Sequence, residues 1–110
     1  GCKLGSDVLI AEAQDSKCYD TVVISKAADA MLAMSGIEAS FVLAKNTQGF
    51  ISISARSRSK LNVQRIMEEL GGGGHFNLAA AQIKDLTLSE AGEKLTEIVL
   101  NEIKEKEKEE

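Results

Sequence analysis

The apolar residues between positions 20 and 35 recur at the spacing of a helix. Counted from Val23, they fall at i, i+4, i+7, i+8 and i+11, so they share one helix face. Asp20 or Thr21 is placed to cap the start of this helix, and Gly36 is placed to end it. The β-branched run at 22–24 also permits a strand in the first turn. The predicted buried face consists of Val23, Ala27, Ala30, Met31 and Met34.

Two segments that alternate between apolar and polar residues follow, at 37–45 and 50–56. The residues between them, 46–49, read Asn-Thr-Gln-Gly, which is turn chemistry. We therefore expect an antiparallel hairpin. The inward-facing residues of its second strand are Ile51, Ile53 and Ala55. Because alternate residues of a strand point to opposite faces, Ser54 and Arg56 project together from the other face.

The C-terminal half of the chain predicts two further helices. Apolar residues at i, i+3, i+4 and i+7 from Val63 form one stripe, and Asn62 precedes it as a cap. Thr87 and Glu90 have the spacing of a capping box, which opens a long helix. The buried stripe of that helix is predicted to be Leu88, Ala91, Leu95, Ile98, Val99 and Ile103.

The order of these elements predicts a single small α/β domain with a mixed sheet, a central antiparallel hairpin and packed helices. We place the domain at 20–103, with a short strand at 82–86 before the last helix. Residues 1–19 have weak periodicity and are interpreted as a linker or entry segment, in which 8–13 form a short helix. Residues 104–110 alternate in charge, which predicts a solvated helix end or a frayed tail.

Composition narrows the classes of partner. The chain has 110 residues, a net charge of −4 and 44% apolar residues, which suits one globular core. No segment approaches the roughly 20 apolar residues of a membrane span. The negative charge disfavours long nucleic acid and anionic membranes, so we expect neither contact. Cys2 and Cys18 have no metal-ligand spacing and fit a reducing compartment, so we expect a cytoplasmic location. Because His75 is the only histidine, a metal centre built on several histidines is excluded, and we expect no cofactor within these residues.

Charge is distributed unevenly along the chain. Residues 56–65 contain no acid, and their bases are Arg56, Arg58, Lys60 and Arg65. A basic segment within an acidic chain favours a bound anion; the alternative is a solvated loop whose bases pair with nearby carboxylates. The guanidinium fork of Arg56 matches phosphate geometry, and the hydroxyls of Ser54 and Ser57 add hydrogen-bonding groups beside it.

Four consecutive glycines, Gly71, Gly72, Gly73 and Gly74, precede His75. A helix stop explains Gly71. Four in a row favour backbone amides that approach a phosphate closely, where a Cβ would block the approach and positive φ is needed. The alternatives are a flexible hinge or a tight packing turn. His75 could donate a hydrogen bond to a phosphate oxygen, act as a general acid, or be a structural donor.

Taken together, three segments resemble a known family. They are Ile53–Ser57, the helix start Asn62–Gln64, and Leu70–His75 followed by Ala79–Ala80. This combination resembles the DHH-associated C-terminal domain of DHH-family phosphoesterases, over residues 19–95. Within the family, the segments Ala27–Asp29 and Gly36–Leu43 resemble the membrane-bound cyclic-di-AMP phosphodiesterases of the GdpP type.

The spacing after His75 separates the branches of this family. The nanoRNase and exonuclease branch usually reads Gly-Gly-His-x-x-Ala-Ala-Gly. Here three residues separate His75 from Ala79, and Gln82 stands where that branch has glycine. The related domain of alanyl-tRNA synthetases usually has arginine after the glycines. The departures favour the cyclic-di-AMP branch.

The resemblance implies a domain that grips the substrate. The implied substrate-binding residues are Ser54, Arg56, Ser57, Gly71, Gly72, Gly73, Gly74, His75 and Asn77. Their implied ligand is a cyclic dinucleotide, hydrolysed to linear pApA, or a short linear dinucleotide. The catalytic machinery, with two manganese ions, would belong to a preceding DHH domain in a parent anchored to the membrane by N-terminal helices. No catalytic or metal-ligating residue is assigned here, so the chain alone is expected to be inactive; a homodimer stays open.

Two alternatives remain at this point. One is the binding half of a nanoRNase or single-strand exonuclease of the same superfamily. The other is a non-enzymatic interaction module, in which the glycines are only a hinge and no nucleotide binds.

Overall fold

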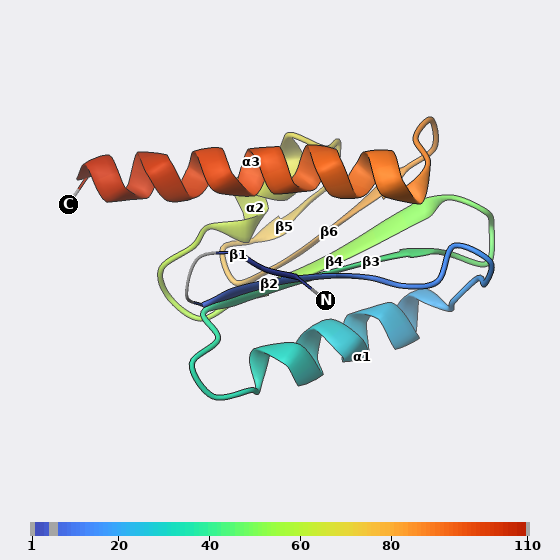
Figure 1. The fold of residues 1–110 in the computed structure, drawn as a ribbon, viewed down its shortest axis with the longest axis horizontal. Helices are drawn as coiled ribbons and strands as arrows, with labels where there is room; N and C mark the ends of the chain where they lie inside the picture. The colour runs from blue at the N-terminus through green and yellow to red at the C-terminus, as the bar shows by residue number, and fades with distance from the viewer. Residues whose placement is uncertain (1, 5–6, 110) are drawn as a thin grey trace.

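The computed structural model describes residues 2–4 and 7–109, which form one mixed sheet with helices on both faces (Figure 1). The elements are β1 (Cys2–Leu4), β2 (Val8–Glu12), α1 (Thr21–Leu32), β3 (Ala39–Lys45), β4 (Ile51–Ser57), α2 (Val63–Glu68), β5 (Gly73–His75), β6 (Leu78–Ile83) and α3 (Leu88–Glu109). The strand order across the sheet is β1-β2-β3-β4-β6-β5. Only β2 and β3 pair in parallel, so the predicted α/β class with a mixed sheet is confirmed.

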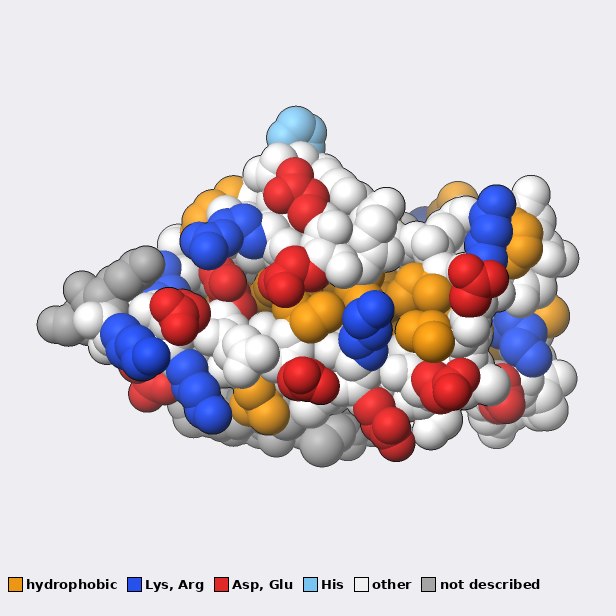
Figure 2. All heavy atoms as spheres, turned by 90° about the horizontal axis from the view of Figure 1, so that it is seen from above, with side chains coloured by type: hydrophobic (Ala, Val, Ile, Leu, Met, Phe, Trp, Pro, Cys, Tyr) orange, Lys and Arg blue, Asp and Glu red, His pale blue; other side chains and the backbone are white. Residues whose placement is uncertain are grey.

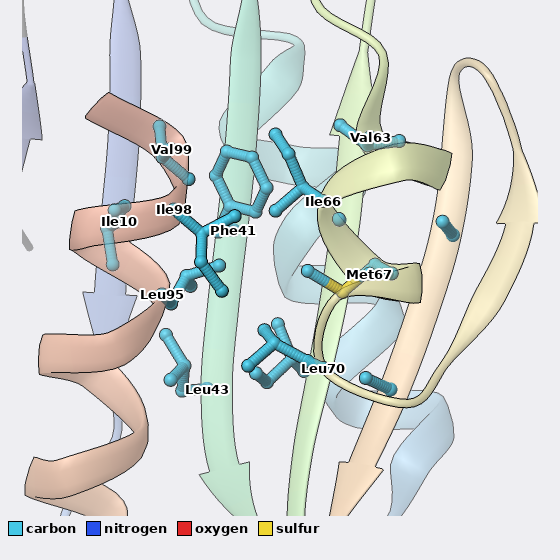
Figure 3. Packing of buried hydrophobic residues seen from close by; sticks show 14 of the residues in the cluster. Ile10, Phe41, Leu43, Val63, Ile66, Met67, Leu70, Leu95, Ile98 and Val99 are labelled. Atoms are coloured by element: carbon cyan, nitrogen blue, oxygen red, sulfur yellow. The ribbon is translucent and has the colours of Figure 1, made fainter. Parts of the chain in front are cut away.

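The helices divide between the two faces of the sheet. α1 connects the parallel strands β2 and β3 and lies on one face, whereas α2 and α3 lie on the other (Figure 1). The larger core fills the space between the sheet and α2 and α3 (Figure 3). A smaller cluster under α1 consists of Ile24, Ala28, Val42 and Ala44. The α1 side is therefore covered by a single helix.

The central hairpin follows the predicted alternation. The side chain of Asn46 accepts hydrogen bonds from the backbone amides of Gln48 and Phe50, which fixes the turn. On β4, the inward-facing residues Ile51, Ile53 and Ala55 are buried in the larger core. The intervening residues of β4 point to the other face, as the sequence predicted, and the structure places α1 on that face.

The predicted helix starts are also confirmed. Asp20 accepts a hydrogen bond from the amide of Val22, and Asn62 accepts one from the amide of Arg65. Thr87 and Glu90 exchange two hydrogen bonds, of 2.9 and 3.1 Å, which is the reciprocal geometry of a capping box. α3 continues to Glu109, and its end is largely exposed.

The expectation of a short helix within the first 19 residues is wrong. Residues 8–12 form strand β2, which lies between β1 and β3 in the sheet. Val8 and Ile10 are buried in the core. A short, continuous apolar run does not distinguish a buried strand from a helix by its periodicity, and pairing with the distant β3 decides the outcome.

The buried face and the end of α1 also differ from the prediction. Its fully buried residues are Ile24 and Ala28, whereas Val23 is 52% exposed and Met34 is 54% exposed. A single helix on a sheet buries only the narrow stripe that touches the strands, so a wider apolar face remains in solvent. The helix ends at Leu32 with Ala33 as its cap, earlier than predicted, and Gly36 takes positive φ in the turn beyond.

The glycine segment contributes a strand instead of remaining a loop. Gly73–His75 forms the edge strand β5, which pairs antiparallel with β6. β6 begins at Leu78, earlier than the strand predicted at 82–86. Its run of small residues carries little strand propensity by itself, and pairing with both β4 and β5 sets its extent.

Candidate functional site

On the α1 side of the sheet, the surface over β6 and β5 is not covered by a helix. α1 packs against β3 and β4. Directly paired residues of neighbouring strands point to the same face, so the register assigns side chains to this surface. One row across the sheet contains Ser54, Ala80 and Gly73, and the next contains Arg56, Leu78 and His75. The register thus places four predicted site residues on one face, which we call the open face.

Burial changes steeply across the open face. Ser54 and Arg56 are 5% and 8% exposed, because α1 covers them. Farther from α1, Ala80 and His75 are exposed and Leu78 is 53% exposed. The open face therefore has a polar side that α1 covers and a solvent-exposed side where Leu78 and Ala80 lie beside His75. Ligand sites commonly combine apolar surface with a few polar groups in this way.

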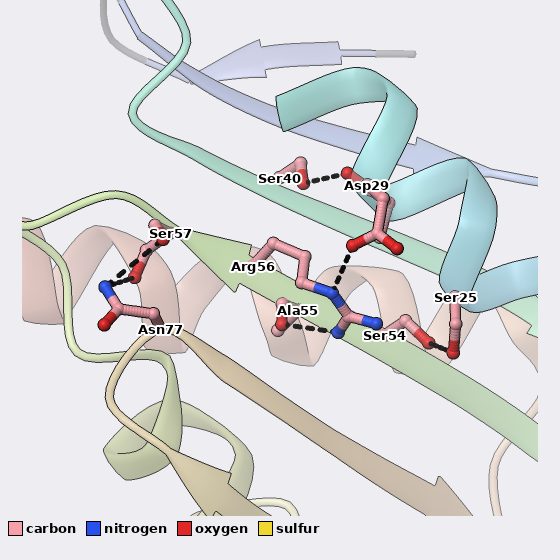
Figure 4. Close-up of polar contacts among 9 residues, drawn as sticks. Ser25, Asp29, Ser40, Ser54, Ala55, Arg56, Ser57 and Asn77 are labelled. Carbon is pink, nitrogen blue, oxygen red and sulfur yellow. Dashed lines mark hydrogen bonds and ion pairs between the residues drawn. The ribbon is translucent and has the colours of Figure 1, made fainter. Parts of the chain in front are cut away.

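Two contacts join α1 to the polar side of the open face (Figure 4). In the first, Nε of Arg56 donates to Oδ1 of Asp29 at 2.7 Å; Nη1 of the same side chain donates within β4, to the carbonyl of Ala55 at 3.0 Å. The hydroxyl of Ser25 lies 3.2 Å from that of Ser54. Arg56 is therefore a buried cation with an anionic partner, which satisfies the usual requirement for burying charge.

Three of the four consecutive glycines are required by the fold itself. Gly71 ends α2 with φ of +85°, and the amides of Gly71 and Gly72 bond back to Glu68 and Met67. A Cβ on Gly72 would lie 2.1 Å from the carbonyl oxygen of Ala80. A Cβ on Gly74 would lie 2.5 Å from the carbonyl oxygen of Leu78, and Gly74 also has φ of +146°.

Gly73 differs from its neighbours. A Cβ built on Gly73 has no heavy atom within 4 Å, and its φ is not positive. The expectation that Gly73 needs positive φ is therefore wrong, because β5 is extended there. Nothing in the described fold requires a glycine at this position, which lies on the open face beside Ala80.

Ser57 and Asn77 lie at the end of β4 and in the β5–β6 turn, where they bond to each other (Figure 4). The amide of Ser57 donates to the carbonyl of Asn77 at 3.0 Å, and Nδ2 of Asn77 donates to the carbonyls of Ser57 and Arg58. The hydroxyl of Ser57 donates to the carbonyl of Phe76. These polar groups hold the turn against β4, so the structure gives the pair an internal bonding role.

The basic segment does not form one patch. Arg56 reaches Asp29 on the α1 side, whereas Nη1 of Arg65 lies 3.8 Å from a carboxylate oxygen of Glu102 on the α3 side. The guanidinium of Arg58 donates to carbonyls of Ile37 and Leu32 at the end of α1. Arg56 and Arg65 therefore pair with carboxylates, as in the alternative left open by the sequence, whereas Arg58 bonds to backbone carbonyls instead.

The opposite face of the molecule carries mixed charge. Viewed from above α3, acidic and basic side chains alternate around an apolar band, and the chain's one histidine projects at the rim (Figure 2). An open surface groove between α2 and α3 is lined by Arg65, Glu68, Glu69, Asn101, Glu102 and Glu105. Its carboxylates make it a poor site for phosphate.

The sequence interpretation did not assign roles to Asp29, Ser25 and Leu78. Ser25 and Asp29 are four residues apart on a helix, which places them on one face toward a neighbouring strand, but only the packing of α1 identifies their partners. Leu78 gives no sequence signal, because an exposed leucine is ordinary. Its place beside Arg56 and His75 comes from the strand register.

Residues 5–106 match the model of the DHHA1 domain, and the chain belongs to this family. The DHHA1 domain is the DHH-associated domain of DHH-family phosphoesterases, so the resemblance found in the sequence is confirmed. Among the described residues, no group of three or more His, Cys, Asp or Glu could hold a metal ion. No helix in that part of the chain is long and apolar enough to cross a membrane.

Several curated relatives carry this domain within much longer chains. The chain is 47% identical over 92 residues to "Cyclic-di-AMP phosphodiesterase GdpP" of Geobacillus thermodenitrificans, covering 84% of this chain and 14% of that protein. It is 49% identical over 86 residues to "Cyclic-di-AMP phosphodiesterase PdeA" of Listeria monocytogenes, covering 78% and 13%. It is also 40% identical over 68 residues to "Bifunctional oligoribonuclease and PAP phosphatase NrnA" of Thermus thermophilus, covering 62% and 21%.

A solved structure supports the same fold. The chain superposes on an exopolyphosphatase-related protein from Bacteroides fragilis with a TM-score of 0.55 and 28% identity, over 67% of this chain and 21% of that one. The chain thus spans about a seventh of the two cyclic-di-AMP phosphodiesterases and about a fifth of the solved protein.

Proposed function

We propose that this chain is the substrate-binding domain of a cyclic-di-AMP phosphodiesterase and that the dinucleotide lies on the open face. The two relatives that are 47% and 49% identical are both named for this activity. The proposal assigns binding, and no catalytic step, to the 110 residues. The oligonucleotide-hydrolase alternative differs in its ligand, which would be linear.

Gly73 is the observation that carries this proposal. Its neighbours Gly72 and Gly74 are glycine because a Cβ would strike β6, whereas a Cβ on Gly73 would extend into open space. A glycine costs conformational entropy in a strand, so one that the fold does not need is best explained by close approach of something else. That approach would occur on the face that Gly73 shares with Ser54 and His75.

The groups around Gly73 suit a dinucleotide. Arg56 and His75, in the neighbouring row, are donors for phosphate oxygens. Leu78 lies between them, and Ala80 lies in the adjoining row on the same strand; together they form an exposed apolar strip, against which a base or ribose would rest. The combination of cationic and apolar groups on one face favours a nucleotide over inorganic phosphate.

The remaining parts of the enzyme would lie outside this chain. The proposal places two manganese ions in a preceding DHH domain, and they would supply the activated water for hydrolysis. It also includes a membrane anchor N-terminal to that domain. The chain's match to only 13–14% of its cyclic-di-AMP relatives leaves room for both.

The test is an NMR titration of the isotope-labelled chain with cyclic-di-AMP and, separately, with linear pApA. We expect shift changes to cluster on Ser54, Arg56, Gly73, His75 and Leu78. Without the DHH domain, the substrate-binding domain is expected to bind weakly, at high micromolar to millimolar ligand. Stronger binding of pApA would favour the nanoRNase alternative, and no shifts with either nucleotide at millimolar concentration would contradict the proposal.

A pair of arginine variants sharpens this test. Arg56→Ala removes a charge-assisted contact of about 1.5–3 kcal/mol, so affinity should fall about tenfold or more. Arg65→Ala is the matched control, because Arg65 belongs to the same basic segment but faces α3. Equal loss of affinity in the two variants would indicate a general charge effect and would contradict the open face as the binding site.

A further inference from the structure

The guanidinium of Arg56 is held in one orientation by groups of this chain. Asp29 accepts from Nε and the carbonyl of Ala55 accepts from Nη1. No described residue bonds to the third nitrogen, Nη2, which Figure 4 shows on the side of Ser54. No buried side-chain nitrogen in the described part of the chain lacks a partner, so Nη2 retains access to solvent.

Asp29 is suited to orient this side chain without occupying the open face. It lies on α1, and its side chain is 62% exposed, so the carboxylate stays hydrated while one oxygen binds Arg56. α1 is itself attached beside it, because the hydroxyl of Ser40 donates to the carbonyl of Ala28 at 2.7 Å. The acceptor for Nε is therefore fixed to a helix that packs on β4.

We propose that Asp29 is a positioning residue for nucleotide binding: it binds Nε of Arg56 so that Nη2 is presented to a phosphate oxygen on the open face. This inference rests on the proposed function. Nε is engaged by Asp29 and one N–H of Nη1 by Ala55, so Nη2 is the guanidinium nitrogen without a partner among the described residues. The contact with the ligand is thus a directed hydrogen bond from a cation that its own carboxylate partner partly neutralises.

Two substitutions separate position from charge. Asp29→Asn retains an oxygen acceptor for Nε but removes the negative charge, whereas Asp29→Ala removes both. If position is decisive, Asp29→Asn binds pApA or cyclic-di-AMP within about twofold of the unchanged chain, and Asp29→Ala loses about tenfold, as Arg56→Ala does. Ser40→Ala is the matched control, because it removes a neighbouring contact of α1 with the sheet and leaves the Arg56–Asp29 pair intact.

A second readout does not depend on any ligand. The Nε–H group of Arg56, observed by nitrogen-correlated NMR, should exchange slowly with solvent in the unchanged chain, in Asp29→Asn and in Ser40→Ala. In Asp29→Ala it should exchange rapidly, although circular dichroism shows the variant to be folded. A purely structural role for Asp29 would lower stability without this selective change at Arg56.

The outcomes distinguish the two proposals. Unchanged affinity of Asp29→Ala, when the unchanged chain binds, would overturn the positioning role alone. So would equal losses in Asp29→Asn and Asp29→Ala, or the same loss in Ser40→Ala. A slowly exchanging Nε–H together with no nucleotide binding by the unchanged chain would contradict the proposed function, and the ligand-directed part of this inference with it.

Discussion

The contrast between Gly72 and Gly73 gives a prediction in which stability and binding move in opposite directions. Gly73→Ala adds a methyl group where no heavy atom lies within 4 Å. Because alanine loses less backbone freedom on folding than glycine, we expect the free energy of unfolding to rise by about 0.4–1 kcal/mol. Gly73→Val should fold equally well, since β-branched residues suit an extended strand.

Gly72→Ala is the opposite case. Its Cβ would lie 2.1 Å from the carbonyl oxygen of Ala80 and 2.7 Å from two carbon atoms of Ala81. The clash is with backbone, so β5 must move away from β6. Forcing a group into such a packed position typically costs about 1–3 kcal/mol. Urea unfolding of the variants, followed by circular dichroism, measures both changes.

Nucleotide affinity should fall in the Gly73 variant that leaves stability unchanged. Gly73→Val fills the space over β5 with a branched side chain, and we expect affinity for the dinucleotide to fall at least tenfold, or about 1.4 kcal/mol. Titration of the same samples by NMR gives this value. If Gly73→Val is folded and binds as well as the unchanged chain, the reasoning from its vacant Cβ position is refuted. If Gly73→Ala is strongly destabilised, the inference that a Cβ at this position meets no other atom is contradicted.

Three further predictions concern single contacts. Thr87→Ala removes the hydroxyl acceptor for the Glu90 amide, and the free energy of unfolding in urea should fall by about 1 kcal/mol; no change would contradict the capping box. A hydrogen bond from the backbone amide of Thr87 to the Glu90 carboxylate, and a second from the Thr87 side chain, lower the pKa of Glu90 from its ordinary value of 4.5. The contribution of this carboxylate to stability is therefore present above pH 4.5 and is lost as pH falls through the lowered pKa. The stability difference between the unchanged chain and Glu90→Gln should accordingly shrink on acidification in pH-dependent melts, and a constant difference would argue against the bond. Leu78→Asp places a carboxylate between Arg56 and His75, so nucleotide affinity should fall severalfold more than in the control Leu78→Ser. Both variants should fold, because Leu78 is exposed. Equal affinities would exclude the strip of Leu78 and Ala80 as part of the site.

Much of the candidate site could be predicted from the sequence, because strand alternation is a local property. The spacing of Ser54 and Arg56 requires that they share a face once β4 is a strand. The four consecutive glycines and the single histidine that follows them are recognisable in the sequence because such a run is unusual. The sequence could not predict that the fold tolerates a side chain at Gly73 and not at Gly72 or Gly74. The atoms that exclude a Cβ at those two positions belong to β6, and the pairing of β5 with β6 is not visible in the local pattern.

The sequence by itself determined the elements whose stabilising contacts lie within a few residues. The caps at Asp20, Asn62 and Thr87 and the turn at Asn46 bond to amides two to four positions away, so their residue types specify them. Each of these interactions joins groups that are close in sequence, so it can be recognised without knowledge of the rest of the fold. The helices and the hairpin were therefore predictable.

Only the tertiary structure decided the features that depend on partners distant in the chain. β2 is a strand because it pairs with β3, and Arg56 is buried because α1 brings Asp29 to it. The open face exists because α1 spans β3 and β4 and leaves β6 and β5 uncovered. Local propensity contains no information about which surfaces meet, since burial and long-range pairing depend on how the whole chain packs.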